Sequence, residues 1–170
     1  MPGITDALEI ERKYIIKMPR VEVLASQENY TSSEILQIYL PSEKGQTRRI
    51  RRRSYADRIK YIETTKIRVD SMSSREIERE MTEEEFLLLS ETILEGTTPI
   101  NKTRHTFSYL GQLFEIDIYP QWQNSAIMET ELPSRETTVA FPEVLEIIRE
   151  VTTDKAYSNA AMSRSFPPEQ

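Results

Sequence analysis

Hydrophobic and polar residues alternate with a period of two along eight stretches of the chain. Such alternation is typical of β-strands, whose successive side chains point to opposite faces of a sheet. Eight strands suit a small closed barrel, so the pattern favours a barrel at the centre of an α+β fold. The predicted strands span residues 8–16, 34–40, 47–53, 59–67, 74–81, 100–108, 112–119 and 126–132.

A helical period marks some of the segments between and after these strands. The clearest helix is predicted over 83–95, where Thr82 and Glu85 form a capping-box pattern and Gly96 supplies the stop. Amphipathic helices of this kind can cover the apolar face of a sheet. Further helices are predicted over 142–149 and 157–163, with a helical turn within 20–30.

The polar face of the predicted strands carries full charges instead of small polar residues. Residues two apart on a strand point the same way, so Glu9 and Glu11 share a face, as do Arg49 and Arg51. This face is acidic on four strands and basic on three others. The other residues on it are Lys13, Gln37, Tyr39, Arg53, Lys66, Glu76, Glu78, Glu80, Lys102, Arg104, Glu115, Asp117, Tyr119, Glu129 and Glu131.

Two interpretations of the charged faces are open at this point. They can be solvated surfaces, which aid solubility and discourage aggregation at strand edges. Alternatively, the barrel closes with its charges inward, and the helices cover its apolar outer face. A site that binds a polyanion through metal ions needs basic groups for the phosphates and carboxylates for the cations. The separation of acidic from basic strands favours this second interpretation.

Composition narrows the chemistry of such a site. The chain has 170 residues, which fits one domain spanning 1–170. It contains no cysteine and one histidine, which excludes disulfides, thiolate metal sites and a multi-histidine zinc site. Any metal must be held by oxygen ligands, so we expect a hard cation, Mg²⁺ or Mn²⁺.

Charge and hydropathy also bound the partners. The net charge of −6 argues against a nucleic-acid binder. The run RRIRRR does not change this, because alternation sends its members to opposite faces, with Arg48, Arg52 and Arg53 expected outside the barrel or at its mouth. No apolar run approaches the roughly 20 residues that span a membrane. The N-terminus lacks a secretory pattern, so we expect a cytoplasmic protein without a membrane partner.

Ordered motifs over about residues 8–162 resemble those of the triphosphate tunnel metalloenzymes, also called the CYTH superfamily. Glu9-Ile10-Glu11-Arg12-Lys13 matches the E-x-E-x-K signature of this family. The resemblance implies an eight-stranded antiparallel tunnel, divalent metal ions, a triphosphate substrate and a homodimer, and it is strongest to the short bacterial members. Further similar motifs are QIYL (37–40), RIR (49–51), TTK (64–66), EIE (76–78), KTR (102–104), FEIDIY (114–119), ETEL (129–132), EVT (150–152) and YSN (157–159).

The resemblance and the charged faces together suggest roles for the residues. The four core metal ligands are predicted to be Glu9, Glu11, Glu129 and Glu131, while Asp117 and Glu78 complete a second metal site or position the attacking water. Lys13 is assigned both to catalysis and to substrate binding. The alternative for the carboxylates is cross-strand ion pairing. The remaining phosphate-binding candidates are Arg49, Arg51, Lys66, Lys102, Arg104 and Lys155.

The function predicted from this resemblance is metal-dependent hydrolysis of inorganic tripolyphosphate. One alternative is a class IV adenylate cyclase or a nucleoside or thiamine triphosphatase, which needs a pocket for an organic group. Another is a non-catalytic polyphosphate-binding module. Because both acidic pairs are present, catalysis is favoured over binding alone.

Overall fold

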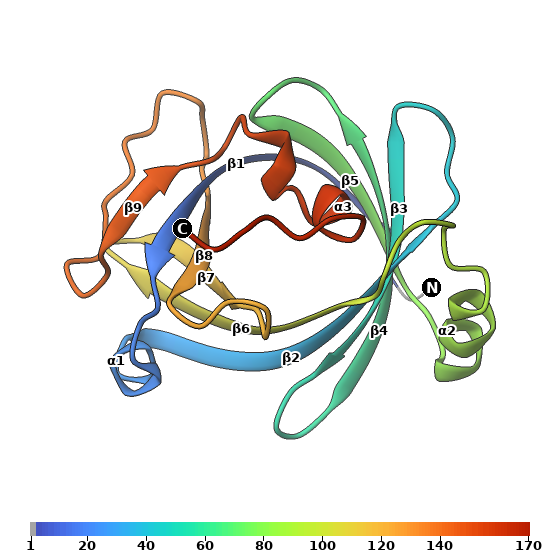
Figure 1. Ribbon diagram of the computed structural model, residues 1–170, viewed down its shortest axis with the longest axis horizontal. Coiled ribbons are helices and arrows are strands. Elements are labelled where there is room, and N and C mark those ends of the chain that lie inside the picture. Colours follow the sequence, from blue (N-terminus) through green and yellow to red (C-terminus); the bar gives the residue numbers. More distant parts are fainter. Residues whose placement is uncertain (1–2) are drawn as a thin grey trace.

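The computed structural model describes residues 3–170 and shows strands that close into a ring (Figure 1). Neighbouring strands are antiparallel throughout, in the ring order β1-β5-β4-β3-β2-β6-β7-β8, which returns to β1. The predicted eight-stranded antiparallel barrel is therefore confirmed. Its strands are β1 (Thr5–Lys17), β2 (Glu28–Leu40), β3 (Gln46–Ser54), β4 (Ile59–Arg68), β5 (Ser73–Glu80), β6 (Ile100–Tyr109), β7 (Gln112–Ile118) and β8 (Ser125–Glu131).

The long strand β1 closes the ring. Its first half pairs with β5 over Thr5–Ile10, and its second half pairs with β8 over Glu11–Lys17. Where β5 stops, a ninth short strand, β9 (Ile147–Glu150), takes over the same edge of β1. The predicted helix over 142–149 is therefore wrong. Pairing of β9 with β1 satisfies the backbone and overrides the helical spacing of the apolar residues in this segment.

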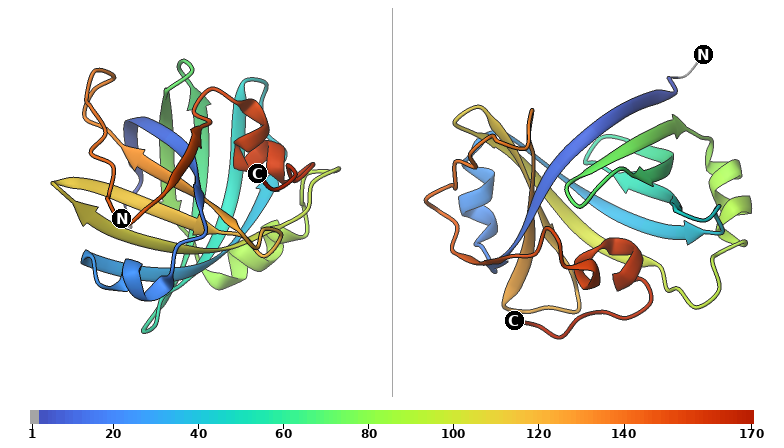
Figure 2. Two further views of the ribbon diagram at one scale, coloured as in Figure 1. Left: turned by 60° about the vertical axis from the view of Figure 1, so that its left-hand side comes forward. Right: turned by 90° about the horizontal axis from the view of Figure 1, so that it is seen from above.

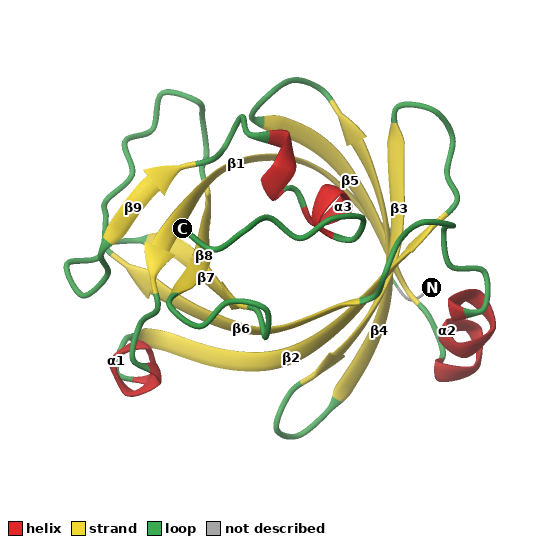
Figure 3. Cartoon of the chain, in the orientation of Figure 1, coloured by secondary structure: helices red, strands yellow, loops and turns green. Residues whose placement is uncertain are grey.

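The few helices lie outside the strands or at one end of the barrel (Figure 3). Helix α1 (Val21–Ala25) and helix α2 (Glu83–Ser90) lie on opposite sides of the ring (Figures 1 and 2). The predicted capping box is present at Thr82, but α2 ends at Ser90, earlier than predicted. In place of one helix over 157–163, the chain forms the 3₁₀ turn η1 (Lys155–Tyr157) and α3 (Asn159–Met162).

The apolar residues of the strands face outward and are covered there. One cluster combines outward residues of β1, β6, β7 and β8 with Leu24 of α1 and Leu145 of the 132–146 segment. A second combines Ile38 and Ile50 with Phe86 of α2. These clusters leave the inward faces free for charged residues, which is the inverted arrangement that the alternation predicts.

A third apolar cluster fills one end of the barrel interior. Ile15, Tyr119 and Ile127 continue the inward faces of their strands and are fully buried. Tyr157 and Met162 of the C-terminal segment pack against them. The C-terminal segment lies at this end of the barrel in the right-hand view of Figure 2. The charged interior therefore ends against an apolar wall.

The β6–β7 hairpin sets the register of two strands that carry site residues. Leu110 and Gly111 form its two-residue turn, with φ of 48° and 76°. Positive φ at both positions matches the twist of the flanking strands. The resulting register places Arg104 directly opposite Asp117. Within residues 3–170, no helix is long and apolar enough to cross a membrane.

Candidate active site

A cavity of about 770 Å³ lies inside the barrel, between the inward faces of the strands and the C-terminal segment. It brings together all but one of the residues that the sequence assigns to the site, and the exception is Asp117. The charged faces therefore line a cavity inside the barrel and not its outer surface. The predicted residues on its wall are Glu9, Glu11, Lys13, Arg49, Arg51, Lys66, Glu78, Lys102, Arg104, Glu129, Glu131 and Lys155.

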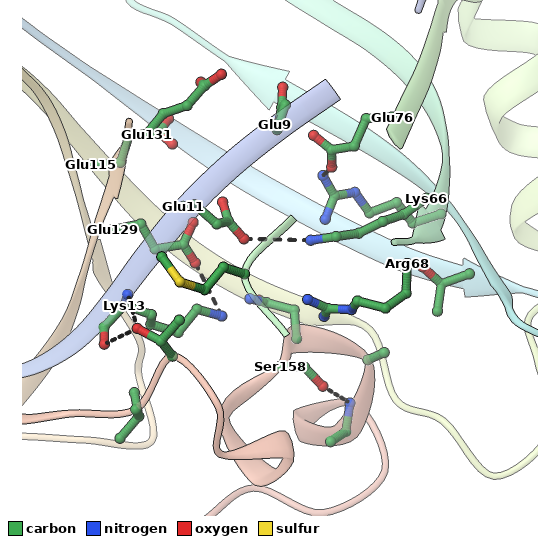
Figure 4. A pocket seen from close by; sticks show the side chains of 18 of the residues that line it. Glu9, Glu11, Lys13, Lys66, Arg68, Glu76, Glu115, Glu129, Glu131 and Ser158 are labelled. Carbon is green, nitrogen blue, oxygen red and sulfur yellow. Dashed lines mark hydrogen bonds and ion pairs between the residues drawn. The ribbon is translucent and has the colours of Figure 1, made fainter. Parts of the chain in front are cut away.

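Carboxylates gather on one side of this cavity, where β1, β5, β7 and β8 meet. The register places Glu11 directly opposite Glu131, and Figure 4 shows Glu9, Glu115 and Glu131 on the same side of the pocket. Burial and the neighbouring carboxylate of Glu76 raise the pKa of Glu9 to about 9. Burial and the charge of Glu115 raise the pKa of Glu131 as well. This side of the cavity therefore favours the neutral form of these carboxyl groups, because few cations lie beside them.

Lys13 and Glu129 lie deeper, next to the C-terminal segment. Lys13 Nζ lies 3.2 Å from Glu129 Oε1 and donates to the Tyr157 carbonyl oxygen at 3.0 Å. Burial opposes ionisation of Glu129, but the charges of Lys13 and Arg104 outweigh it and lower its pKa to about 2. Figure 4 shows this pair pointing into the pocket from β1 and β8. A buried lysine here is charged and ready to bind an anion.

Arginines form the opposite wall, on β3 and β6. The Nε atoms of Arg49 and Arg51 are buried and have no hydrogen-bond partner within residues 3–170. The side chain of Arg51 is 7% exposed, and its ion pair with Glu78 is long, at 3.8 Å. Burial and the positive charges of Arg49 and Arg104 lower the pKa of Arg51 to about 9. Buried guanidinium groups with unpaired N–H atoms are suited to bind an anion such as a phosphoryl group.

Asp117 is held away from the cavity by two cations. Both of its oxygens accept hydrogen bonds from Arg104 at 2.8 Å, and Lys102 Nζ lies 3.0 Å from it. The side chain is 1% exposed, and these cations hold its pKa well below the usual range despite burial. The geometry gives Asp117 the role of fixing Arg104 and Lys102. Its predicted roles as metal ligand or water-positioning group stay untested.

Other predicted residues are paired more loosely. Lys66 contacts Glu11 at 3.5 Å, and Arg49 contacts Glu76 at 3.4 Å, both across the cavity wall. Long ion pairs of this kind are easily exchanged for contacts with a bound anion and cation. Lys155, the first residue of η1, is exposed and lines the cavity from the C-terminal segment.

The cavity wall also contains residues to which the sequence gave another role or none, and Arg53, Arg68 and Asn159 are the most relevant of them. Arg53, which was expected outside or at the mouth, lines the cavity and donates to Ser33 Oγ at 2.8 Å. Arg68 also lines it, and the signal was present, because Arg68 continues the inward face of Lys66. Asn159 lines it from α3. By contrast, Arg48 pairs with Glu63 on the outer face, as expected.

The donor chemistry of the acidic side fits a hard divalent cation. Carboxylate oxygens are the ligands that Mg²⁺ and Mn²⁺ prefer. Burial, the hydrogen bond with Glu76 and the charges of the neighbouring carboxylates raise the pKa of Glu9, and a bound cation would oppose each of these effects. Within residues 3–170, no three acidic or histidine side chains already form a ready-made cage, so cation binding requires some of these side chains to rotate.

The fold recurs in solved structures. The inorganic triphosphatase NE1496 is 27% identical, with a TM-score of 0.61 and an alignment that covers 94% of this chain and 97% of its own. PH1819 from Pyrococcus horikoshii OT3 is 22% identical, with a TM-score of 0.56 and coverage of 75% of this chain and 80% of its own. A putative adenylate cyclase from Bacillus halodurans is 15% identical, with a TM-score of 0.53 and coverage of 77% and 83%. The last two show the fold alone. No protein-family model and no curated protein matches the sequence.

Proposed function

We propose that the chain is a member of the triphosphate tunnel metalloenzyme (CYTH) superfamily, similar to its short bacterial members, and that it hydrolyses a triphosphate inside the barrel. We further propose inorganic tripolyphosphate as the substrate and Mg²⁺ or Mn²⁺ as the cofactor. Water adds to one phosphorus atom, one phosphoanhydride bond breaks, and the products are phosphate and pyrophosphate. The observation that carries this proposal is the cavity inside the barrel, with arginines on one wall and a group of acidic side chains on the other.

The arginine wall would bind the phosphoryl oxygens. Arg49, Arg51 and Arg104 project into the cavity from two strands and can donate several N–H groups each. Lys13 adds a point charge from β1, and Lys66 adds another from β4, the strand next to β3. Because these groups are fixed by strand register and burial, little reorganisation is needed when the negative charge of the reaction develops.

The acidic wall would hold the cation. Glu9, Glu11 and Glu131 are the residues best placed for this, since they line the cavity from the paired strands β1 and β8. Within residues 3–170, the one salt bridge that any of them makes is the long one between Glu11 and Lys66. When bound, a divalent ion neutralises phosphoryl oxygens and stabilises the leaving group. Glu129 is already engaged by Lys13 and would serve mainly to hold that lysine.

Glu78 is the better of the two candidates for accepting the proton of the attacking water. It lines the cavity, and its contacts with Arg51 and Thr64 are long, at 3.8 and 3.5 Å. Asp117 has both oxygens occupied by short hydrogen bonds. A free carboxylate at the cavity wall can accept a proton, whereas one locked by two cations cannot do so without breaking those bonds.

Phosphate release tests the proposal. Wild-type protein with Mg²⁺ or Mn²⁺ is given tripolyphosphate, ATP or thiamine triphosphate in turn, and cyclic AMP is measured alongside. We expect turnover to be fastest with tripolyphosphate and to be lost in the double variant Glu9→Gln, Glu11→Gln, because carboxamides bind divalent cations poorly.

The other outcomes separate the remaining functions. Dominant formation of cyclic AMP from ATP would indicate a cyclase and would overturn the proposed hydrolysis. Binding of tripolyphosphate without turnover, at every divalent metal concentration, would indicate a binding module. Full activity in the glutamine double variant would refute the assignment of the metal ligands alone.

A further inference from the structure

Asn159 is the residue through which the C-terminal segment contributes a polar side chain to the deep end of the cavity. It lies on the cavity wall, and its side chain is largely buried. Ser158 Oγ caps α3 by accepting a hydrogen bond from the Ala161 N–H at 3.1 Å, which fixes the backbone at this point. Asn159 is therefore held in place, and it is not a mobile side chain at a free terminus.

Two hydrogen bonds determine how the amide of Asn159 is oriented. Its Oδ1 accepts from Lys102 Nζ and from the Tyr119 hydroxyl, each at 3.2 Å. A lysine ammonium has no acceptor, so a flipped amide would set N–H groups against a donor and is excluded. The carbonyl oxygen has two lone pairs, and these bonds use both of them.

The amide nitrogen is consequently left with unused donors. Because the amide is planar, Nδ2 lies on the side of the group away from the Oδ1 lone pairs. Within residues 3–170, Nδ2 donates to no protein atom, while the residue itself faces the cavity. The Nδ2 atom is not among the fully buried atoms without a partner, so it is accessible from the cavity and can donate to an acceptor bound there.

The basic side chains around Asn159 favour an anion as this acceptor. Lys102 lies next to it, and Lys13 is held nearby by the carbonyl of Tyr157, from the same C-terminal segment. We propose that Asn159 is a substrate-binding residue that donates its amide N–H groups to a phosphoryl oxygen of the triphosphate at the deep end of the cavity. This inference rests on the proposed triphosphate function.

The substitution Asn159→Asp distinguishes two roles of the side chain: donating an N–H group to phosphate, and holding Lys102 and Tyr119 in place. A carboxylate of nearly the same shape still accepts from Tyr119 and Lys102, but it cannot donate and it repels phosphate. The matched control is Asn101→Asp, which adds the same charge at an exposed position on β6. Binding of tripolyphosphate is measured by calorimetry with EDTA present, and KM is measured with Mg²⁺.

We expect Asn159→Asp to melt within a few degrees of the wild type and to bind tripolyphosphate at least about tenfold more weakly, since a hydrogen bond to a charged group is lost. KM should rise to a similar degree, and Asn159→Ala should also bind more weakly. The Asn101→Asp control should bind like the wild type.

Three results would overturn this inference, and they are distinguishable. If the wild type neither binds nor cleaves any triphosphate, the proposed function itself fails. If the wild type is active and Asn159→Asp binds as tightly as it does, Asn159 does not donate to substrate. If only Asn159→Ala binds weakly, Asn159 acts through Lys102 and Tyr119, and its role is support.

Discussion

Replacing Arg51 by methionine should make the protein more stable and a poorer binder of triphosphate. Arg51 is almost fully buried, its only ion pair is long, and its Nε has no partner within residues 3–170. Methionine keeps the length of the side chain and removes the charge. In the absence of substrate, the free energy lost by burying the charge of Arg51 therefore exceeds the free energy gained from its contacts with neighbouring residues.

The size of the effect follows from the environment of the guanidinium. Burial, with the charges of Arg49 and Arg104, lowers the pKa of Arg51 from its ordinary value to about 9, which corresponds to an upper limit of about 5 kcal/mol. The contact with Glu78 is lost in the variant, so the net gain should be on the order of 2 kcal/mol, within the range found when buried charges are replaced by apolar groups. For a chain of this length, that raises Tm by roughly 4–8 °C.

Two assays on the same preparations measure the expected gain in stability and the expected loss of triphosphate binding. Thermal unfolding without metal should show the higher Tm, and phosphate release should show a KM for tripolyphosphate raised by roughly 10- to 100-fold, because a charge-assisted contact is lost. The control Arg52→Met removes the adjacent, exposed arginine and should change neither value appreciably. A lower Tm in Arg51→Met would show that Arg51 is a stabilising ion pair and would refute the reasoning.

Three further predictions concern the carboxylates. In denaturant titrations, Asp117→Asn should lower the free energy of unfolding by about 3–5 kcal/mol, because buried Arg104 and Lys102 lose their counter-charge. The control Glu115→Gln should lower it by less than about 1 kcal/mol, because Glu115 is more exposed. Equal losses in the two variants would contradict this reasoning. In the folded protein Glu9 keeps its proton up to about pH 9, whereas in the unfolded chain the carboxyl releases it near pH 4.5. The stability of the metal-free protein should therefore fall as the pH rises between these values. A series of Tm measurements against pH should show a smaller fall for Glu9→Gln than for the wild type. At pH 8, Mg²⁺ should raise Tm and release protons, and Glu9→Gln should weaken both effects; an equal Tm rise in the variant would place the cation elsewhere.

The barrel could be predicted from the sequence because local alternation and global architecture agree in it. A charged inward face and an apolar outward face repeat on strand after strand, so each strand reinforces the same inference. For residues 142–149, the sequence alone could not distinguish a helix from a strand. The apolar residues there fit a helical period, but β9 forms because the edge of β1 beyond β5 needs a hydrogen-bond partner there.

Alternation along each strand predicts which residues point into the barrel, but it does not predict which residues pair with one another. The inward side of each strand follows from alternation, which also identifies Arg68, since it lies two residues beyond Lys66. The pairing of Asp117 with Arg104 depends on register, and the two-residue turn at Leu110 and Gly111 carries that information. The contact of Asn159 with Lys102 joins residues 57 apart in the chain, which no local pattern reveals.

A crystal structure with tripolyphosphate and Mn²⁺ tests the central claim most directly. We predict polyphosphate density inside the barrel against Arg49, Arg51 and Arg104, with anomalous manganese density beside Glu9 and Glu11. Polyphosphate bound on the outer surface with the cavity filled only by water, or manganese held away from these glutamates at saturating concentration, would contradict the account.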